Sequence, residues 1–292
     1  MIVDFQHDLA EIAKDMMRQA GISIVVEWND CYCCIKYFEL LHRWFDSSTP
    51  YKVVYSKELW KKLSELTANE LSAVQNIVYR LENCISITPY MSKDIKKTAI
   101  QKSDFLLKNW DIYHLHLEKQ IPKKRFTNPN LLFFQTKGQV VHLIDIRKHP
   151  KGSEWFIKDL LEIVYENWPW LLNYFPGCTP THKIEDCHVH NTLKSMVVGI
   201  PFKNGMLMPT TLGVAGSGDS GTAVRTAYNI LNRLRLCETE LRQNEKIIRN
   251  EIFTSMFLRV DEPLDYTLII EDGFFVAYEK HTNAKIRLFE AK

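Results

Sequence analysis

Apolar residues in the first third of the chain recur at intervals of three and four positions, which places them on one face of an α-helix. This spacing predicts helices over residues 4–20, 31–45 and 67–83. The face of the first helix is formed by Phe5, Leu9, Ile12, Ala13, Met16 and Met17. We therefore expect residues 1–90 to form an α-rich N-terminal region.

Two local signals add detail to this region. Thr67 and Glu70 have the spacing of a capping box, in which a hydroxyl and a carboxylate bind the free amides at the start of a helix. A β-branched run over residues 22–28 predicts a strand between the first two helices.

In the middle of the chain the pattern changes to short apolar runs of strand length. Residues 112–117, 131–135 and 140–146 are predicted as three strands. A short turn containing Gly138 joins the last two, which favours an antiparallel hairpin. We expect residues 91–175 to form a central sheet.

The remaining region, residues 176–292, combines both patterns. It is predicted to contain a hairpin over residues 195–208, a long helix over residues 222–256 and a β-meander at the end. A helix over residues 153–168 precedes it and offers one broad apolar face to the central sheet. The predicted fold class is α+β, with two structural units.

Composition limits the class of protein. The chain has 292 residues, of which 46% are hydrophobic and 25% charged, as in ordinary globular proteins. It has no apolar run of the roughly 20 residues that span a bilayer, and the first residues lack a secretory signal. We therefore expect a cytoplasmic protein without a membrane partner. Its seven cysteines, an odd number, are expected to be thiols: Cys31, Cys33, Cys34, Cys84, Cys178, Cys187 and Cys237.

Charge is balanced over the whole chain but not locally. The formal net charge is +2, whereas residues 93–125 contain nine lysines and arginines against four acids. Such a stretch attracts phosphates and predicts RNA or another nucleic acid as a partner. A solvated surface whose lysines only maintain solubility is the alternative.

Histidines stand beside this basic stretch. Because strand side chains alternate, His114 and His116 share one face of the first central strand. Metal-independent RNA cleavage needs groups that transfer protons and cations that stabilise the phosphate. The candidate catalytic residues are His114, His116, Arg147 and His149, and the candidate nucleic-acid-binding residues are Lys119, Lys123, Lys124 and Arg125. The alternative is a pair of histidines satisfied by hydrogen bonds on a half-buried sheet.

The order of the central strands resembles that in a known family. A strand with tyrosine, a basic residue and leucine precedes a Leu-Leu-Phe strand and a Val-x-x-Ile-Asp-Ile strand that ends in a basic-His pair. Over residues 111–149 this order resembles the sheet of RelE/ParE-type toxins. The resemblance implies mRNA cleavage, as in the RelE branch, with catalytic roles at the four candidates named above. This chain differs by a twelve-residue insertion over residues 118–129 and by Asn130 in place of an expected arginine.

A second candidate site lies in residues 171–191, which are predicted to be irregular. Four residues of zinc-ligand type fall within thirteen positions: Cys178, His182, Cys187 and His190. Their spacing differs from the usual CxxC units, and His188 or Asp186 could equally serve as a ligand. A polar loop with incidental thiols is the alternative. No other cofactor is expected.

Residues 213–221, GVAGSGDSG, match two patterns. Gly216-x-Gly218-x-x-Gly221 fits the dinucleotide fingerprint, but the long helical pattern that follows does not fit a βαβ unit. Gly218-Asp219-Ser220-Gly221 is also the tetrad around the nucleophile of chymotrypsin-like proteases, where strands rather than a helix follow it. The interpretation that we prefer is a loop in which Asp219 or Ser220 caps the helix.

These observations favour a nucleic-acid-directed cytoplasmic protein, a metal-independent ribonuclease of toxin or antiviral-defence type. A non-enzymatic module that binds a protein partner or inhibitor through the long helix over residues 222–256 is the alternative. A zinc-dependent hydrolase built on residues 178–190 is the third hypothesis.

Overall fold

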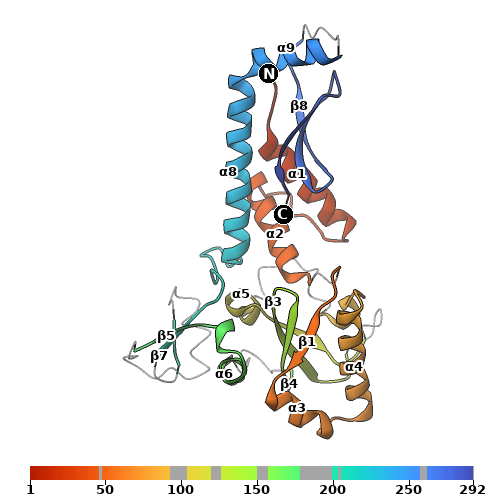
Figure 1. Cartoon of the computed structure of the whole chain (residues 1–292), viewed down its shortest axis with the longest axis vertical. Coiled ribbons are helices and arrows are strands. Elements are labelled where there is room, and N and C mark those ends of the chain that lie inside the picture. Colours follow the sequence, from red (N-terminus) through yellow and green to blue (C-terminus); the bar gives the residue numbers. More distant parts are fainter. Residues whose placement is uncertain are drawn as a thin grey trace. The chain divides into compact units, whose positions relative to one another are not determined.

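The structure is a computed structural model of the chain (Figure 1). It describes residues 1–45, 48–92, 104–119, 126–149, 157–177, 199–202, 205–256 and 262–291. The described residues form helices and three separate β-sheets, so the fold class is α+β, as predicted.

Contacts divide the chain into two compact units, each described by itself below. One unit contains residues 1–38 and 223–292, and the other contains residues 39–222. The three regions expected from the sequence follow one another along the chain and were defined by the spacing of apolar residues. The two units are defined by contacts in the structure, and one of them joins the two ends of the chain. The chain passes between the units within two helices, α2 (Asp30–Arg43) and α8 (Gly221–Gln243).

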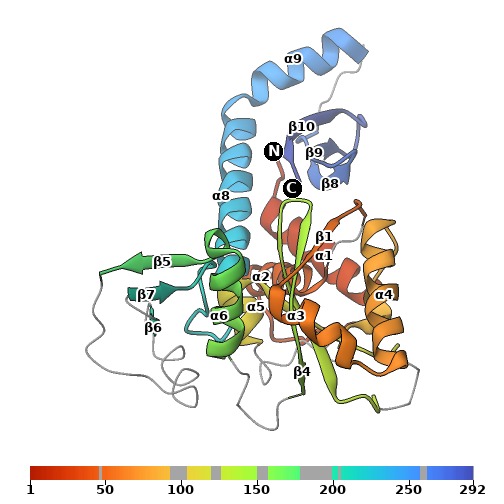
Figure 2. The same cartoon turned by 60° about the horizontal axis from the view of Figure 1, so that its bottom comes forward.

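The unit made of the two chain ends packs helices against a β-meander. The meander has the order β10-β9-β8, and both strand pairs are antiparallel. The other elements of this unit are α1 (Phe5–Gln19), α9 (Glu245–Met256), β8 (Tyr266–Glu271), β9 (Phe274–Glu279) and β10 (Lys285–Glu290). Figures 1 and 2 show α1 and α8 side by side next to the meander. Its core includes Phe5, Leu9, Leu234, Tyr266 and Phe275.

The central unit is built on a four-stranded sheet with the order β1-β4-β3-β2. Strand β1 pairs in parallel with β4, and the other two pairs are antiparallel. The strands are β1 (Lys52–Tyr55), β2 (Ile112–His116), β3 (Asn130–Lys137) and β4 (Val140–Lys148). Strand β2 therefore lies at an edge of the sheet, and β3 separates it from β4.

Each face of this sheet carries its own core, because apolar residues from β2, β3 and β4 alternate between the two. On one face, Leu132, Phe134 and Leu143 pack with Val74 and Ile77 of α4 (Ala68–Glu82). The opposite face packs on α5 (Phe105–Trp110) and α6 (Ile157–Asn167), with a core that includes Trp110, Leu131, Phe133, Leu160 and Val164. Figure 2 shows α4 and α6 on opposite sides of these strands.

Shorter elements complete the central unit. A small sheet of order β5-β7-β6 contributes Phe202 and Leu207 to the core beneath α6. The short elements are α3 (Lys57–Lys62), η1 (Leu63–Glu65), η2 (Thr88–Tyr90), η4 (Pro169–Leu171), β5 (Asn173–Pro176), β6 (Ile200–Phe202) and β7 (Gly205–Met208).

The structure corrects three predicted elements. In the segment over residues 171–191, which was predicted to be irregular, Asn173–Pro176 form strand β5 and pair with β7. Residues 22–28 form no strand; Val26 is 93% exposed, and β-branched residues without a neighbouring strand gain nothing from an extended conformation. The helix predicted over residues 222–256 is two helices, α8 and α9, separated at Asn244.

The described cysteines are thiols, as expected, and two of those in α2 lie in the core. Cys33 and Cys34 are fully buried and, like the other described cysteines, free. Burial, with a smaller contribution from the neighbouring thiols Cys31 and Cys33, raises the pKa of the Cys34 thiol to about 12. Neither thiol therefore has the character of a nucleophile or a metal ligand.

Candidate functional site

Strand register brings the predicted catalytic residues to one face of the central sheet. His116 of β2 lies opposite Leu131 of β3, which in turn lies opposite Arg147 of β4. Residues that face one another across paired strands project from the same side. Strands β2 and β4 are not neighbours, but both contribute to this face across β3. His149 follows the end of β4, and its backbone N–H donates to the carbonyl of Pro129.

The rings of three histidines lie next to one another. The centroids of His114 and His116 are 6.5 Å apart, and those of His116 and His149 are 6.3 Å apart. We call these three residues the histidine cluster. It combines a half-buried ring at His114, a buried one at His116 and an exposed one at His149.

His116 shares a face with His114, as the alternation predicts, but it is buried. Its residue surface is 7% exposed, and its ring stacks on Phe126 with centroids 3.7 Å apart and planes 8° from parallel. Burial, together with a smaller effect of the neighbouring histidines, lowers the pKa of His116 to about 4. The ring is therefore neutral at pH 7, so it cannot donate a proton as an imidazolium.

His114 has a carboxylate neighbour that the sequence reasoning missed. Its Nδ1 atom lies 3.2 Å from Oδ2 of Asp104. Asp104 also caps α5, since its Oδ1 accepts a hydrogen bond from the backbone N–H of Leu107. Burial raises the pKa of Asp104, but the hydrogen bond and charge of His114 outweigh this effect, and the net pKa is lowered. The position of Asp104 directly before an apolar run is the sequence signal for a cap.

Arg147 is held by two carboxylates. Its Nε lies 2.5 Å from Oδ2 of the fully buried Asp145, and its Nη1 lies 3.2 Å from Oδ2 of Asp159. The ammonium of Lys62 also lies 2.7 Å from Oδ1 of Asp145. A buried carboxylate needs such partners, because removing a charge from water costs several kcal/mol. A phosphate at Arg147 would therefore compete with Asp159, whose side chain is 52% exposed.

The basic residues predicted to bind nucleic acid are only partly described. Lys119 lines a hollow of about 240 Å³ together with Asn69 and Asn76 of α4. Lys123, Lys124 and Arg125 lie outside the described residues, and so does the predicted zinc set of Cys178, His182, Cys187 and His190. In the described part of the chain, no three histidines, cysteines or acids gather closely enough to hold a metal ion.

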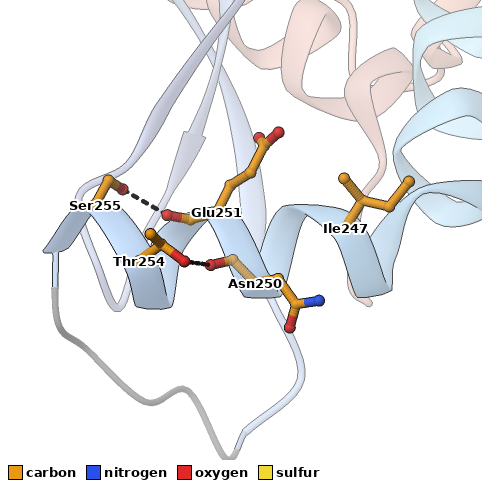
Figure 3. Close-up of a pocket in the computed structure, with 5 residues that line it drawn as sticks. All are labelled: Ile247, Asn250, Glu251, Thr254 and Ser255. Carbon is orange, nitrogen blue, oxygen red and sulfur yellow. Dashed lines mark hydrogen bonds between the residues drawn. The ribbon is translucent and has the colours of Figure 1, made fainter.

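A further hollow, of about 600 Å³, is lined by residues from a single helix. Figure 3 shows its lining residues on α9: Ile247, Asn250, Glu251, Thr254 and Ser255. The hydroxyls of Thr254 and Ser255 both donate to carbonyls of their own helix, those of Asn250 and Glu251. This surface therefore brings together no pair of groups suited to proton transfer or nucleophilic attack.

Comparisons with known proteins assign this chain to no family. A scan against models of protein families found no match, and neither did searches of curated proteins and of solved structures. Of the helices in the described residues, none combines the length and apolar character that a membrane crossing demands.

Proposed function

We propose that the protein acts on nucleic acid and cleaves RNA at the histidine cluster without a metal ion. The observation that carries this proposal is the succession of three imidazole rings, at centroid separations of 6.5 Å and 6.3 Å, on the sheet face that also holds Arg147. The local resemblance to RelE/ParE-type toxins supports the same activity and a role in toxicity or antiviral defence.

The surroundings of each ring suggest a division of roles. His149 is exposed at the end of β4 and is placed to accept the proton of a ribose 2′-hydroxyl. His114, oriented by Asp104, supplies a proton to the departing 5′-oxygen. The P–O5′ bond breaks as the 2′-oxygen forms its bond to phosphorus, which leaves a 2′,3′-cyclic phosphate.

His116 has a different role in this scheme. Its pKa of about 4 makes it a weak base at neutral pH, so it serves as a neutral ring between its two neighbours. Arg147 supplies the positive charge for the phosphate once the strand of RNA displaces Asp159. The sequence named all three histidines as catalytic candidates; the burial of His116 favours His114 and His149 for proton transfer.

The test is RNA cleavage in the presence of a chelator. The wild type should release products that end in a cyclic phosphate, and the double variant His114→Gln with His149→Gln should lose at least about 100-fold in rate. His7→Gln is the control, because His7 is an exposed histidine in the other unit. Unfolding curves should show that the double variant remains folded. Full activity in that variant, or no cleavage of RNA by the wild type, would overturn the proposal.

A second candidate is a non-enzymatic module that binds a protein partner. The observation that favours it is the exposure of large apolar side chains on α8, where Tyr228 is 51% and Leu236 is 64% exposed. Isolated apolar side chains are common on surfaces, so this carries less weight than the histidine cluster. A stable partner complex that is lost in Leu236→Glu, with no cleavage of RNA, would favour it.

A further inference from the structure

The loop before α8, residues 209–220, is hydrogen-bonded to helix α5. The backbone N–H groups of Thr210 and Thr211 both donate to the carbonyl of Asn109, at 2.8 Å and 3.1 Å. Farther along, the ammonium of Lys108 donates to the carbonyl of Gly218 at 2.7 Å. Because Asp111 is the C-cap of α5, these bonds fix both the loop and Asp111 to the same short helix.

The loop also closes on itself. The N–H of Ala215 donates to the carbonyl of Asp219 at 2.8 Å, and the N–H of Gly221 donates to that of Gly213 at 2.7 Å. Gly213 has a φ of +67°, a backbone conformation that a residue with a side chain adopts only with strain. These contacts hold Ser220 at the position immediately before the first residue of α8.

The end of α2 is fixed to the same helix by buried charges. Glu39 lies 2.7 Å from the ammonium of Lys108 and 2.8 Å from Nη2 of Arg43. Burial raises the pKa of Glu39, but the two cations outweigh it, so the carboxylate is charged. His42, within the same turn of α2, is thereby held close to Asp111 and Ser220.

These three elements bring a hydroxyl, an imidazole and a carboxylate into one chain of contacts. Nε2 of His42 lies 2.9 Å from Oδ1 of Asp111, and Nδ1 lies 3.5 Å from Oγ of Ser220. Asp111 has a φ of +54°, in the left-handed region that aspartate and asparagine tolerate better than most residues. A proton on Nε2 that is donated to Asp111 leaves the lone pair of Nδ1 directed toward the serine hydroxyl.

We propose that Ser220, His42 and Asp111 are the nucleophile, general base and orienting carboxylate of a second reactive site, for carboxylic esters. The oxygen of Ser220 bonds to the ester carbonyl carbon as its proton passes to Nδ1 of His42. The carbon–oxygen bond to the alcohol then breaks, and the alcohol leaves with that proton. Water attacks the acyl-serine in the same way, releasing the carboxylic acid and restoring the hydroxyl.

Access to the nucleophile depends on the loop. Ser220 is fully buried, whereas the side chains of His42 and Asp111 are 17% and 37% exposed. An ester therefore reaches the hydroxyl only when residues 213–219 move away from it. A Cβ added at Gly216 would meet nothing within 4 Å, so this part of the loop has open space beside it. The reaction should accordingly be slow, and a small reactive probe is the appropriate reporter.

The experiment is labelling of the full chain with a fluorophosphonate, followed by intact mass and peptide mapping. One adduct should form at Ser220 in the wild type and be absent in Ser220→Ala. Ser217→Ala is the matched control, because this serine of the same loop donates to Asp219 instead of facing His42; it should label like the wild type. Asp111→Asn retains a residue suited to the left-handed conformation and removes the charge. It should slow labelling at least about tenfold and change its pH profile.

Two results would overturn this second site. One is a wild type that forms no adduct after prolonged exposure to the probe, and the other is an adduct that persists in Ser220→Ala. If Ser220 has only a structural role, Ser220→Ala should unfold at a lower midpoint than the wild type, and the wild type should not be labelled. The rate of RNA cleavage should be unchanged in Ser220→Ala. The proposal of RNA cleavage and the proposal of a second site at Ser220 are therefore tested independently.

Discussion

Asp104 joins the start of helix α5 to the imidazole of His114 through the two oxygens of a single carboxylate. Oδ1 accepts the backbone N–H of Leu107 at 3.1 Å, and Oδ2 lies 3.2 Å from Nδ1 of His114. The orientation of a candidate catalytic ring therefore depends on the same residue that caps the helix packed against the sheet.

Replacement of Asp104 should separate these two contributions. Asp104→Asn keeps an acceptor for the amide of Leu107 and loses the charge, whereas Asp104→Ala loses both. The alanine variant should be about 1 kcal/mol less stable than the asparagine variant in urea unfolding. Equal stabilities would show that the cap contributes nothing.

The charge contribution of Asp104 should depend on pH. His114 holds the net pKa of this carboxyl below its ordinary value, despite the opposing effect of burial. Its stabilisation is complete above the ordinary aspartate pKa of about 4 and is lost as the pH falls through the lowered value. The stability difference between the wild type and Asp104→Asn should therefore shrink in acid. A difference that does not change with pH would contradict this pairing.

His116 should destabilise the fold as the pH falls. Burial lowers its pKa from 6.5 to about 4, so the unfolded chain binds a proton over this interval more readily than the folded protein does. The contribution of His116 to stability is therefore most favourable above pH 6.5 and falls by up to about 3 kcal/mol toward pH 4. His116→Phe keeps a ring to stack on Phe126 and should remove this part of the pH dependence. The measurement is urea unfolding of the wild type and of His116→Phe between pH 4 and 7. If the stabilities of the two proteins change in parallel with pH, the prediction is wrong.

Local signals in the sequence predicted much of the central unit. The apolar pattern and Gly138 predicted the antiparallel pairing of β3 with β4. The capping box of Thr67 and Glu70 is present at the start of α4, with both reciprocal hydrogen bonds. These features depend on residues a few positions apart, so the chemistry of each segment is sufficient to specify them.

Relationships between distant segments were not predicted. The parallel pairing of β1 with β4 joins residues almost ninety positions apart, such as Lys52 and Val140. The sequence of either strand does not indicate which strand it pairs with. The same holds for the carboxylates beside Arg147, and for the approach of His42 to Ser220 across 178 positions. Alternation correctly predicted that His114 and His116 share a face, but it could not reveal that Phe126 covers His116.

Removal of Asp159 should strengthen the binding of RNA. This acid lies on α6 with its carboxylate 3.2 Å from Arg147, where it competes with a phosphate. Asp159→Asn should raise RNA affinity roughly fivefold at low salt, and less at high salt, because the lost charge is partly exposed. Fluorescence anisotropy in the His114→Gln, His149→Gln background measures this without cleavage.

The control for Asp159 is Glu162→Gln, which removes an exposed acid from the same helix. Its affinity should change less than that of Asp159→Asn. Equal gains would show that only overall charge matters and that Arg147 does not bind the phosphate. Neither substitution should change stability by more than about 0.5 kcal/mol, since surface charges contribute little.

Glu279 should be the most sensitive acid of the β-meander. It is fully buried, its Oε1 accepts the backbone N–H of Asp265, and its Oε2 accepts the N–H groups of His281 and Thr282 and the hydroxyl of Thr282. Burial raises the pKa of Glu279, but these donors outweigh it, so the net pKa is lowered. All four of these hydrogen-bond partners are donors, so the NH2 group of a neutral amide at this position would face one of them.

Glu279→Gln should therefore cost about 2–3 kcal/mol, because its amide nitrogen meets a donor and a buried N–H loses its acceptor. Hydrogen exchange should rise first in β8, β9 and β10. Glu271→Gln is the matched control in the same meander: its partner Lys285 is exposed, so the loss of stability should be much smaller than in Glu279→Gln. Similar costs for the two variants would mean that the hydrogen bonds to Glu279 do not hold the meander together.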